Sequence, residues 1–70
     1  MNDFKEGQKV YFKKPFRMFT GIFGDGEISV VHYDEVQVLM GQGTRGECGK
    51  FFPIEELKEL LREPEGREPR

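Results

Sequence analysis

The chain has 70 residues, of which 13 are acidic, 11 are basic and one is cysteine. A chain of this length forms one small domain, and a single cysteine excludes an intramolecular disulfide. No stretch approaches the roughly 20 apolar residues of a membrane-spanning helix, and residues 1–6 lack the apolar segment of a signal peptide. We therefore expect a cytoplasmic protein with no membrane partner, since a lone thiol suits a reducing compartment.

The net charge of −2 conceals an uneven distribution along the chain. Residues 1–18 carry five cations against two anions, whereas residues 19–43 carry four anions and no cation. The remaining residues mix six cations with seven anions. A basic beginning beside an acidic middle is consistent with a polar partner surface, and equally with an ordinary solvated exterior.

The first predicted strand covers residues 7–14, where apolar and polar side chains alternate. Val10 and Phe12 share the face that we expect to be buried. The opposite face carries Lys9, Tyr11 and Lys13. Because proline cannot donate a ladder hydrogen bond, we expect Pro15 to end this strand or to lie on a sheet edge.

A second strand is predicted over residues 16–23, followed by Gly24-Asp25-Gly26. An Asp-Gly pair between two apolar runs is typical of a hairpin turn, because glycine tolerates a positive φ. The glycine-free run from residue 27 to residue 40 then contains two strands. We place a turn or bulge between them at Asp34-Glu35, where the apolar character is interrupted, although one long bent strand is also possible.

The C-terminal part begins with a glycine-rich loop over residues 41–49, and Phe51-Phe52 is the last predicted strand. An amphipathic helical turn follows Pro53. Its apolar stripe consists of Ile54, Leu57, Leu60 and Leu61. Residues 62–70 are charged and contain no apolar anchor, so we expect them to form a disordered tail.

This arrangement resembles an SH3-like barrel, a small rolled sheet closed by a short helical turn. The segments that carry the resemblance are Glu6-Gly7-Gln8-Lys9-Val10-Tyr11-Phe12, Thr20-Gly21-Ile22-Phe23 and Phe52-Pro53-Ile54-Glu55-Glu56-Leu57. The resemblance implies an all-β fold: an SH3-like five-stranded barrel closed by a short C-terminal helical turn, spanning residues 1–61. Such barrels include KOW-type RNA-binding modules, a small stromal protein of photosystem I and the type II dihydrofolate reductases, so the fold alone does not imply a function.

The sequence offers no catalytic, metal-binding or cofactor-binding motif. Cys48 lies beside Glu47, and His32, the one histidine, lies in an apolar strand. Cys48 and His32 could meet in the fold, but the sequence offers no third group to orient them for catalysis. In the loop at 41–49, glycine spacing differs from that of a phosphate-binding loop, and a strand follows where a helix would be needed. The reductases build their pore from Val-Gln-Ile-Tyr in the last strand, where this chain has Gly49-Lys50-Phe51-Phe52. We therefore expect no enzyme, no metal and no cofactor.

A basic-aromatic strip on the first strands is the candidate binding site. It comprises Lys9, Tyr11, Lys13, Lys14, Phe16 and Arg17. Aromatic and arginine side chains dominate the energy of protein interfaces, so our leading hypothesis is a non-enzymatic small binding module that engages a protein partner. The alternative is a nucleic-acid-binding barrel for single-stranded DNA or RNA, in which bases stack on rings while cations contact phosphates. A second alternative is an oligomeric enzyme with a site shared between protomers, and the edge near Pro15 to Phe19 could dock a second copy.

Overall fold

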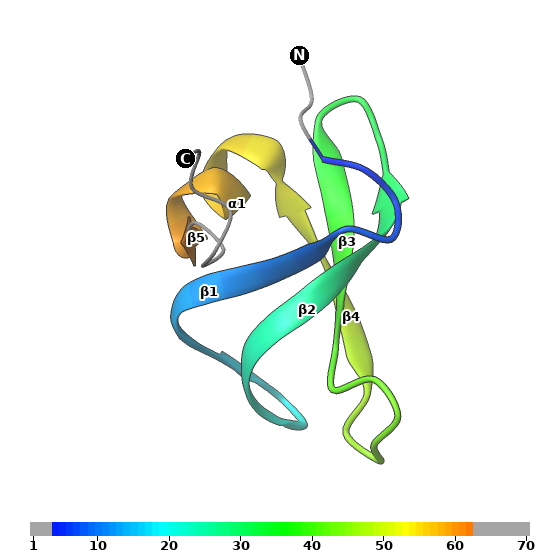
Figure 1. Ribbon diagram of the computed structural model, residues 1–70, viewed down its shortest axis with the longest axis vertical. Helices are drawn as coiled ribbons and strands as arrows, with labels where there is room; N and C mark the ends of the chain where they lie inside the picture. The colour runs from blue at the N-terminus through cyan, green and yellow to red at the C-terminus, as the bar shows by residue number, and fades with distance from the viewer. Residues whose placement is uncertain (1–3, 63–70) are drawn as a thin grey trace, which may run out of the picture.

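The computed structural model describes residues 4–62 and shows a small, mostly-β domain: a five-stranded antiparallel sheet with one short helix (Figure 1). The elements in chain order are β1 (Lys9–Met18), β2 (Gly21–Val31), β3 (Glu35–Met40), β4 (Cys48–Pro53), α1 (Ile54–Leu60) and β5 (Leu61–Arg62). Within residues 4–62, no helix is long and apolar enough to cross a membrane. The predicted tail, apart from Arg62, lies outside the described residues.

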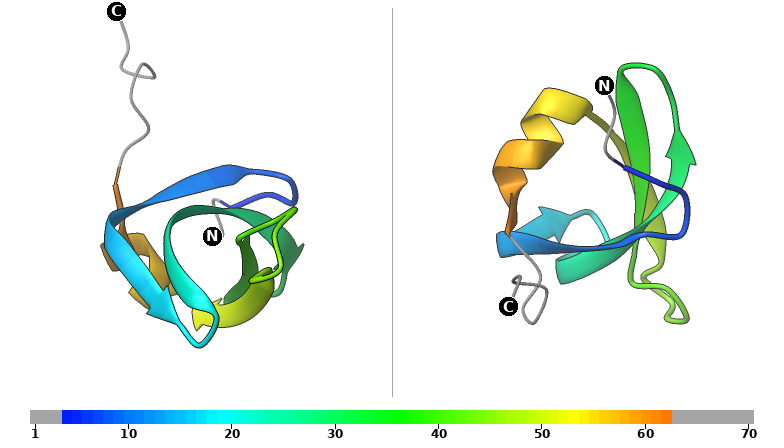
Figure 2. Two further views of the ribbon diagram at one scale, coloured as in Figure 1. Left: turned by 90° about the horizontal axis from the view of Figure 1, so that it is seen from below. Right: turned by 45° about the horizontal axis from the view of Figure 1, so that its top comes forward.

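The strands are hydrogen-bonded in the order β4-β3-β2-β1-β5. The sheet curls strongly, and α1 connects its two ends, β4 and β5 (Figure 2). Those two edge strands are not paired with each other in the part of the chain that the structure describes, so the sheet is open. The coarse prediction of a mostly-β domain with five strands and one short helix near the C-terminal end is confirmed.

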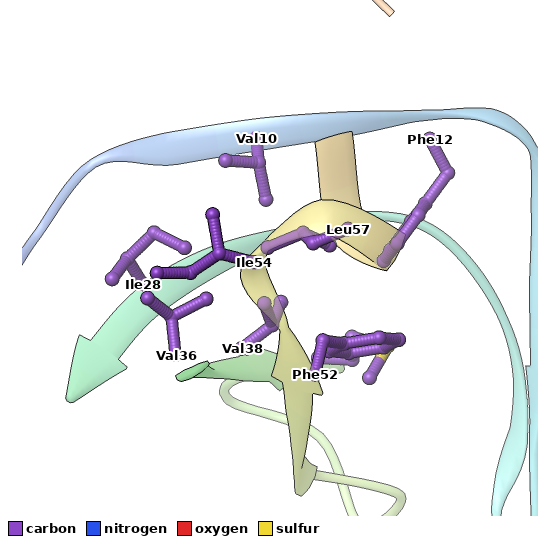
Figure 3. Close-up of a cluster of buried hydrophobic side chains, with 9 residues drawn as sticks. Val10, Phe12, Ile28, Val36, Val38, Phe52, Ile54 and Leu57 are labelled. Atoms are coloured by element: carbon purple, nitrogen blue, oxygen red, sulfur yellow. The ribbon is translucent and has the colours of Figure 1, made fainter. Parts of the chain in front are cut away.

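The concave side of the sheet and the inner side of α1 enclose one apolar core (Figure 3). Its buried members are Val10, Phe12, Ile28, Val36, Val38, Met40, Phe52, Ile54 and Leu57. Alternation accounts for most of them, because every second residue of a strand faces the same side. The largest fully buried side chain is Phe52, which β4 contributes to this core.

Of the two alternatives expected for Pro15, the end of the strand is wrong, because β1 continues through it to Met18. Within residues 4–62, β5 pairs only with Tyr11 and Phe12, so on that side Pro15 lies on an unpaired edge, as the other alternative expected. The register with β2 shifts between Tyr11 and Phe16: Tyr11 lies opposite Asp25, whereas Phe16 lies opposite Phe23. The extra residues on β1 form a bulge that contains Pro15. A bulge does not need every N–H for the ladder, so proline is accommodated there.

The predicted hairpin at Gly24-Asp25-Gly26 is also wrong. The turn between β1 and β2 lies at Phe19 and Thr20, with Met18 opposite Gly21, and β2 runs straight through the glycine pair. Gly26 is buried, and a Cβ there would lie 2.6 Å from Val38 Cγ1. Glycine at this position therefore permits the close approach of β3, rather than a turn.

The interruption near Asp34-Glu35 is confirmed as the β2–β3 connection, which is closed by the His32 N–H donating to the Glu35 carbonyl at 2.8 Å. The last residue of the predicted helical stripe is misplaced. Leu61 has an extended backbone and opens β5, which pairs with Phe12 and Tyr11 of β1. Arg62 belongs to β5, so the ordered sheet extends one residue beyond the predicted boundary.

Candidate functional site

The residues of the predicted strip are spread along the whole length of β1. Lys9, at the start of β1, lies opposite Glu27 of β2, whereas Arg17 lies opposite Ile22 near the β1–β2 turn. The β1 bulge separates these two positions. The strip is therefore divided into an N-terminal part, a central part at the bulge and a part at the hairpin end.

Phe16 does not face outward with the cations of the predicted strip. Its ring stacks on Phe12 at a centroid distance of 5.3 Å and meets Phe52 edge-on at the same distance. Phe12 and Phe16 are four residues apart, so alternation places them on the same face of β1, and both contact the core. Phe16 remains half-buried, because it lies at the margin of that core.

Tyr11 is also less available than the sequence suggests. The guanidinium carbon of Arg62 lies 5.4 Å from the centroid of the Tyr11 ring, in a cation–π arrangement. Asp25 is its neighbour on the other side, in the ladder with β2. Arg62 of β5 therefore occupies one face of the Tyr11 ring.

A groove of about 260 Å³ lies between the β1 bulge and the C-terminal half of α1. Its lining residues are Lys13, Lys14, Pro15, Phe16, Glu59 and Leu60. Three of the predicted strip residues, Lys13, Lys14 and Phe16, thus come together here. The two residues that α1 contributes were not among the predicted site residues, although Leu60 already belonged to the predicted helical stripe.

The chemistry of this groove combines an apolar floor with a charged rim. Pro15, Phe16 and Leu60 provide the apolar surface, and the exposed Lys13 and Lys14 provide cations on the β1 side. On the α1 side the exposed Glu59 provides one anion. Because Phe16 packs against Phe12 and Phe52, the floor is held by the core and is preformed.

The other surface features lie away from this groove. A second concavity is lined by Lys5, Glu6, Gly7 and Gln8, all from one loop. Phe19 at the β1–β2 turn and Tyr33 in the β2–β3 connection are almost fully exposed, at opposite ends of the molecule (Figure 1). Each is a single exposed ring, and neither lines one of the two concavities described above.

The structure separates the two side chains that might have formed a nucleophilic pair. Cys48 is the first residue of β4, and its Sγ lies 3.4 Å from the hydroxyl of Thr20 in the β1–β2 turn. His32 instead stacks on Phe51, near the other end of that strand, at a centroid distance of 5.6 Å. Among residues 4–62, no group of three His, Cys, Asp or Glu side chains is placed to hold a metal ion.

No protein-family model, no curated protein and no solved structure matches this chain. The function must therefore be argued from the groove and the sheet themselves.

Proposed function

We propose that this protein is a non-enzymatic binding module built on an SH3-like barrel, and that it engages a protein partner through the groove between the β1 bulge and α1. The partner segment that suits this groove contains an acidic residue next to a large apolar one. The observation that carries the proposal is the preformed apolar floor of Pro15, Phe16 and Leu60 beside two exposed lysines.

The SH3-like part of the proposal rests on connectivity. β1 pairs with β2 along both of its ends and with β5 at Tyr11 and Phe12, so the first strand lies between the second and the last. The long β2 pairs with both β1 and β3, and the sheet curls around a single core. A short helix between β4 and β5 then brings the chain back to β1, which is the closure expected of such a barrel.

The groove favours an acidic, partly apolar peptide for two reasons. An apolar side chain placed on Phe16 and Leu60 would remove their surfaces from water, which stabilises the complex by about 25 cal/mol per Å² of apolar area buried. A carboxylate beside it would meet Lys13 and Lys14, while Glu59 would repel an acidic group from the α1 side. The charge distribution therefore sets the orientation of the bound segment.

Nucleic acid is a weaker candidate than a protein. Single-stranded binding needs open rings along a track of cations, and here Arg62 covers Tyr11 while Phe16 packs into the core margin. Lys9 lies opposite the acidic Glu27, so its charge is partly offset. The other exposed lysines of the strip, Lys13 and Lys14, line the groove. There the carboxylate of Glu59 would repel a polyanion.

The test is a selection of peptides from a random displayed library on the immobilised protein. We expect enriched sequences that combine Asp or Glu with an aromatic or aliphatic residue. Their affinity should fall at least tenfold for the double variant Lys13→Glu/Lys14→Glu. An apolar floor variant, Leu60→Ser, should weaken binding of the same peptides.

The matched control is Lys5→Glu/Arg45→Glu, which reverses two exposed cations outside the groove and so changes the net charge equally. Unchanged affinity in this control, with loss in the groove variant, supports the proposal. Equal loss in both variants would show non-specific attraction to positive charge and contradict it. Failure to enrich any acidic-apolar motif would contradict it as well.

A further inference from the structure

The outer edge of β4 has no strand partner among residues 4–62, and its hydrogen-bonding groups follow a regular alternation. β4 pairs with β3 so that Val36 lies opposite Phe52 and Val38 lies opposite Lys50. The Ile54 N–H donates to the Asp34 carbonyl at 3.1 Å in the same register. In an antiparallel ladder, alternate residues direct both backbone groups to the same neighbour. Even-numbered residues of β4 therefore bond to β3.

The odd-numbered residues of β4, Gly49, Phe51 and Pro53, direct their backbone groups to the unpaired edge. Gly49 and Pro53 are exposed, and Phe51 is 40% exposed. Proline has no N–H, and in a sheet it is tolerated where that group would have faced away from the ladder. The position of Pro53 therefore agrees with this alternation, which leaves the N–H groups of Gly49 and Phe51 as the donors on the edge.

We infer that this edge pairs with the same edge of a second copy of the chain, antiparallel and about a two-fold axis at Phe51. This inference concerns a different surface from the groove and does not depend on the proposed function. At the axis, each Phe51 N–H donates to the Phe51 carbonyl of the other copy. Two residues away, each Gly49 N–H donates to the Pro53 carbonyl opposite. Pro53 has no N–H to return to the Gly49 carbonyl opposite, so each Gly49–Pro53 pair is joined by one hydrogen bond instead of two.

The side chains agree with this register. The two Phe51 rings lie directly opposite each other on the convex face, and each already stacks on its own His32 at 5.6 Å. On the concave face, Lys50 lies opposite Phe52 of the other copy, and in its own chain Lys50 already lies 5.5 Å from the Phe52 ring centroid. A register centred on Lys50 would place two like charges directly opposite, which is destabilising.

The self-complementary edge favours a second copy over an unrelated strand, because each donor meets an acceptor of the same segment. The interface is small, well below the roughly 1,200 Å² buried by stable complexes, so the pair should be weak. We expect a dissociation constant on the order of 1 mM. Edge strands are open to pairing unless they are covered, charged or interrupted by proline. β4 carries one charge, on Lys50, and its one proline, Pro53, is the last residue of the strand.

Amide hydrogen exchange measured at two protein concentrations tests the inference. At a dissociation constant of about 1 mM, roughly 90% of chains are monomeric at ~50 μM and roughly 40% at ~2 mM. The Gly49 and Phe51 amides should therefore exchange about twofold more slowly in the concentrated sample. The Lys50 and Phe52 amides, which bond to β3, should exchange at the same rate in both samples.

A pair of variants at one position isolates the backbone donor. Phe51→Pro removes the edge N–H together with the ring, whereas Phe51→Ala removes the ring alone. Sedimentation at ~2 mM should show partial dimerisation of the Phe51→Ala protein and a monomer for Phe51→Pro. If Phe51→Pro does not fold, the exchange rates of the unmodified protein still decide the question.

Three results would overturn the inference. The first is fast exchange of the Gly49 and Phe51 amides at the same rate at both protein concentrations, because this would mean that the edge of β4 is unpaired. The second is slow exchange of both amides at every concentration, which means that the chain covers its own edge. The third is dimerisation of the Phe51→Pro protein at the same strength as the Phe51→Ala protein, which places the contact elsewhere.

Discussion

Replacing Gly26 with alanine should destabilise the domain, although the backbone there needs no positive φ. A Cβ at this position would lie 2.6 Å from Val38 Cγ1 and 2.7 Å from the Leu39 carbonyl oxygen. Carbon atoms in contact prefer about 3.5–4.0 Å, so the Val38 methyl would have to move by about 0.9 Å. Val38 is fully buried, and the Leu39 carbonyl belongs to the strand that pairs with β2.

Two effects of opposite sign set the magnitude. Replacing glycine with alanine stabilises by about 0.4–1 kcal/mol through the unfolded chain where the native backbone allows it. Overpacking a filled core costs about 1–3 kcal/mol, and here neither neighbour can withdraw freely. The overpacking dominates, so we expect a net loss of about 1–2 kcal/mol. For a domain of this size, that corresponds to a fall of roughly 5–15 °C in Tm.

Gly24→Ala is the matched control, since this glycine also lies in β2 and nothing lies within 4 Å of the Cβ it would gain. We expect it to be neutral or slightly stabilising. Urea unfolding followed by circular dichroism gives both free energies. The reasoning would be refuted by equal effects of the two substitutions, or by stabilisation in Gly26→Ala, because either result would mean that β3 does not approach β2 closely at Gly26.

Two further predictions concern the core and the β1–β5 closure. Phe52→Ala should cost about 3–5 kcal/mol and unfold so small a domain, whereas Phe51→Ala should leave a dispersed amide spectrum; a folded Phe52→Ala protein would contradict the core described here. Arg62→Ala should lower the free energy of unfolding by about 0.5–1 kcal/mol by removing the contact with the Tyr11 ring, and Arg45→Ala should not. Equal urea midpoints for these two arginine variants would mean that β5 does not hold Arg62 over β1.

Alternation predicts the core well where strands are regular. Val10 and Phe12 in β1, and Val36 and Val38 in β3, are buried as their period of two indicates. The strand boundaries fail where tertiary contacts decide. β1 pairs with β2 in one register before the bulge and in another after it, so the bulge that contains Pro15 depends on contacts between two strands. Gly26 is explained by a neighbouring strand that is distant in sequence.

The five predicted strands agree with the observed number for a partly different reason. The predicted breaks lie at Pro15 and at Gly24-Asp25-Gly26, but β1 and β2 cross these positions, and the first residue of the two-residue β5 was assigned to the helix. A strand of two residues has no periodicity to detect. It forms because Leu61 and Arg62 meet β1 after α1 ends.

The candidate site was predictable only in part. Lys13 and Lys14 stand out in the sequence as exposed cations, and both line the groove. The orientation of Phe16 was missed because the sequence prediction began a new strand at residue 16. Alternation continued from Val10 and Phe12 places Phe16 on their inward face, where the structure has it. Glu59 and Leu60 reach the groove through the return of α1 toward β1, which no local pattern encodes.

The most direct test of the central claim is an amide-shift titration of the labelled protein with a selected acidic-apolar peptide, beside a titration with a mixed-sequence single-stranded oligonucleotide at low salt. Our account predicts peptide-induced shifts at Lys13, Lys14, Phe16 and Leu60, with little response to the oligonucleotide. Shifts confined to Lys9, Tyr11 and Arg17, produced by the oligonucleotide and reversed by added salt, would contradict it and favour nucleic-acid binding.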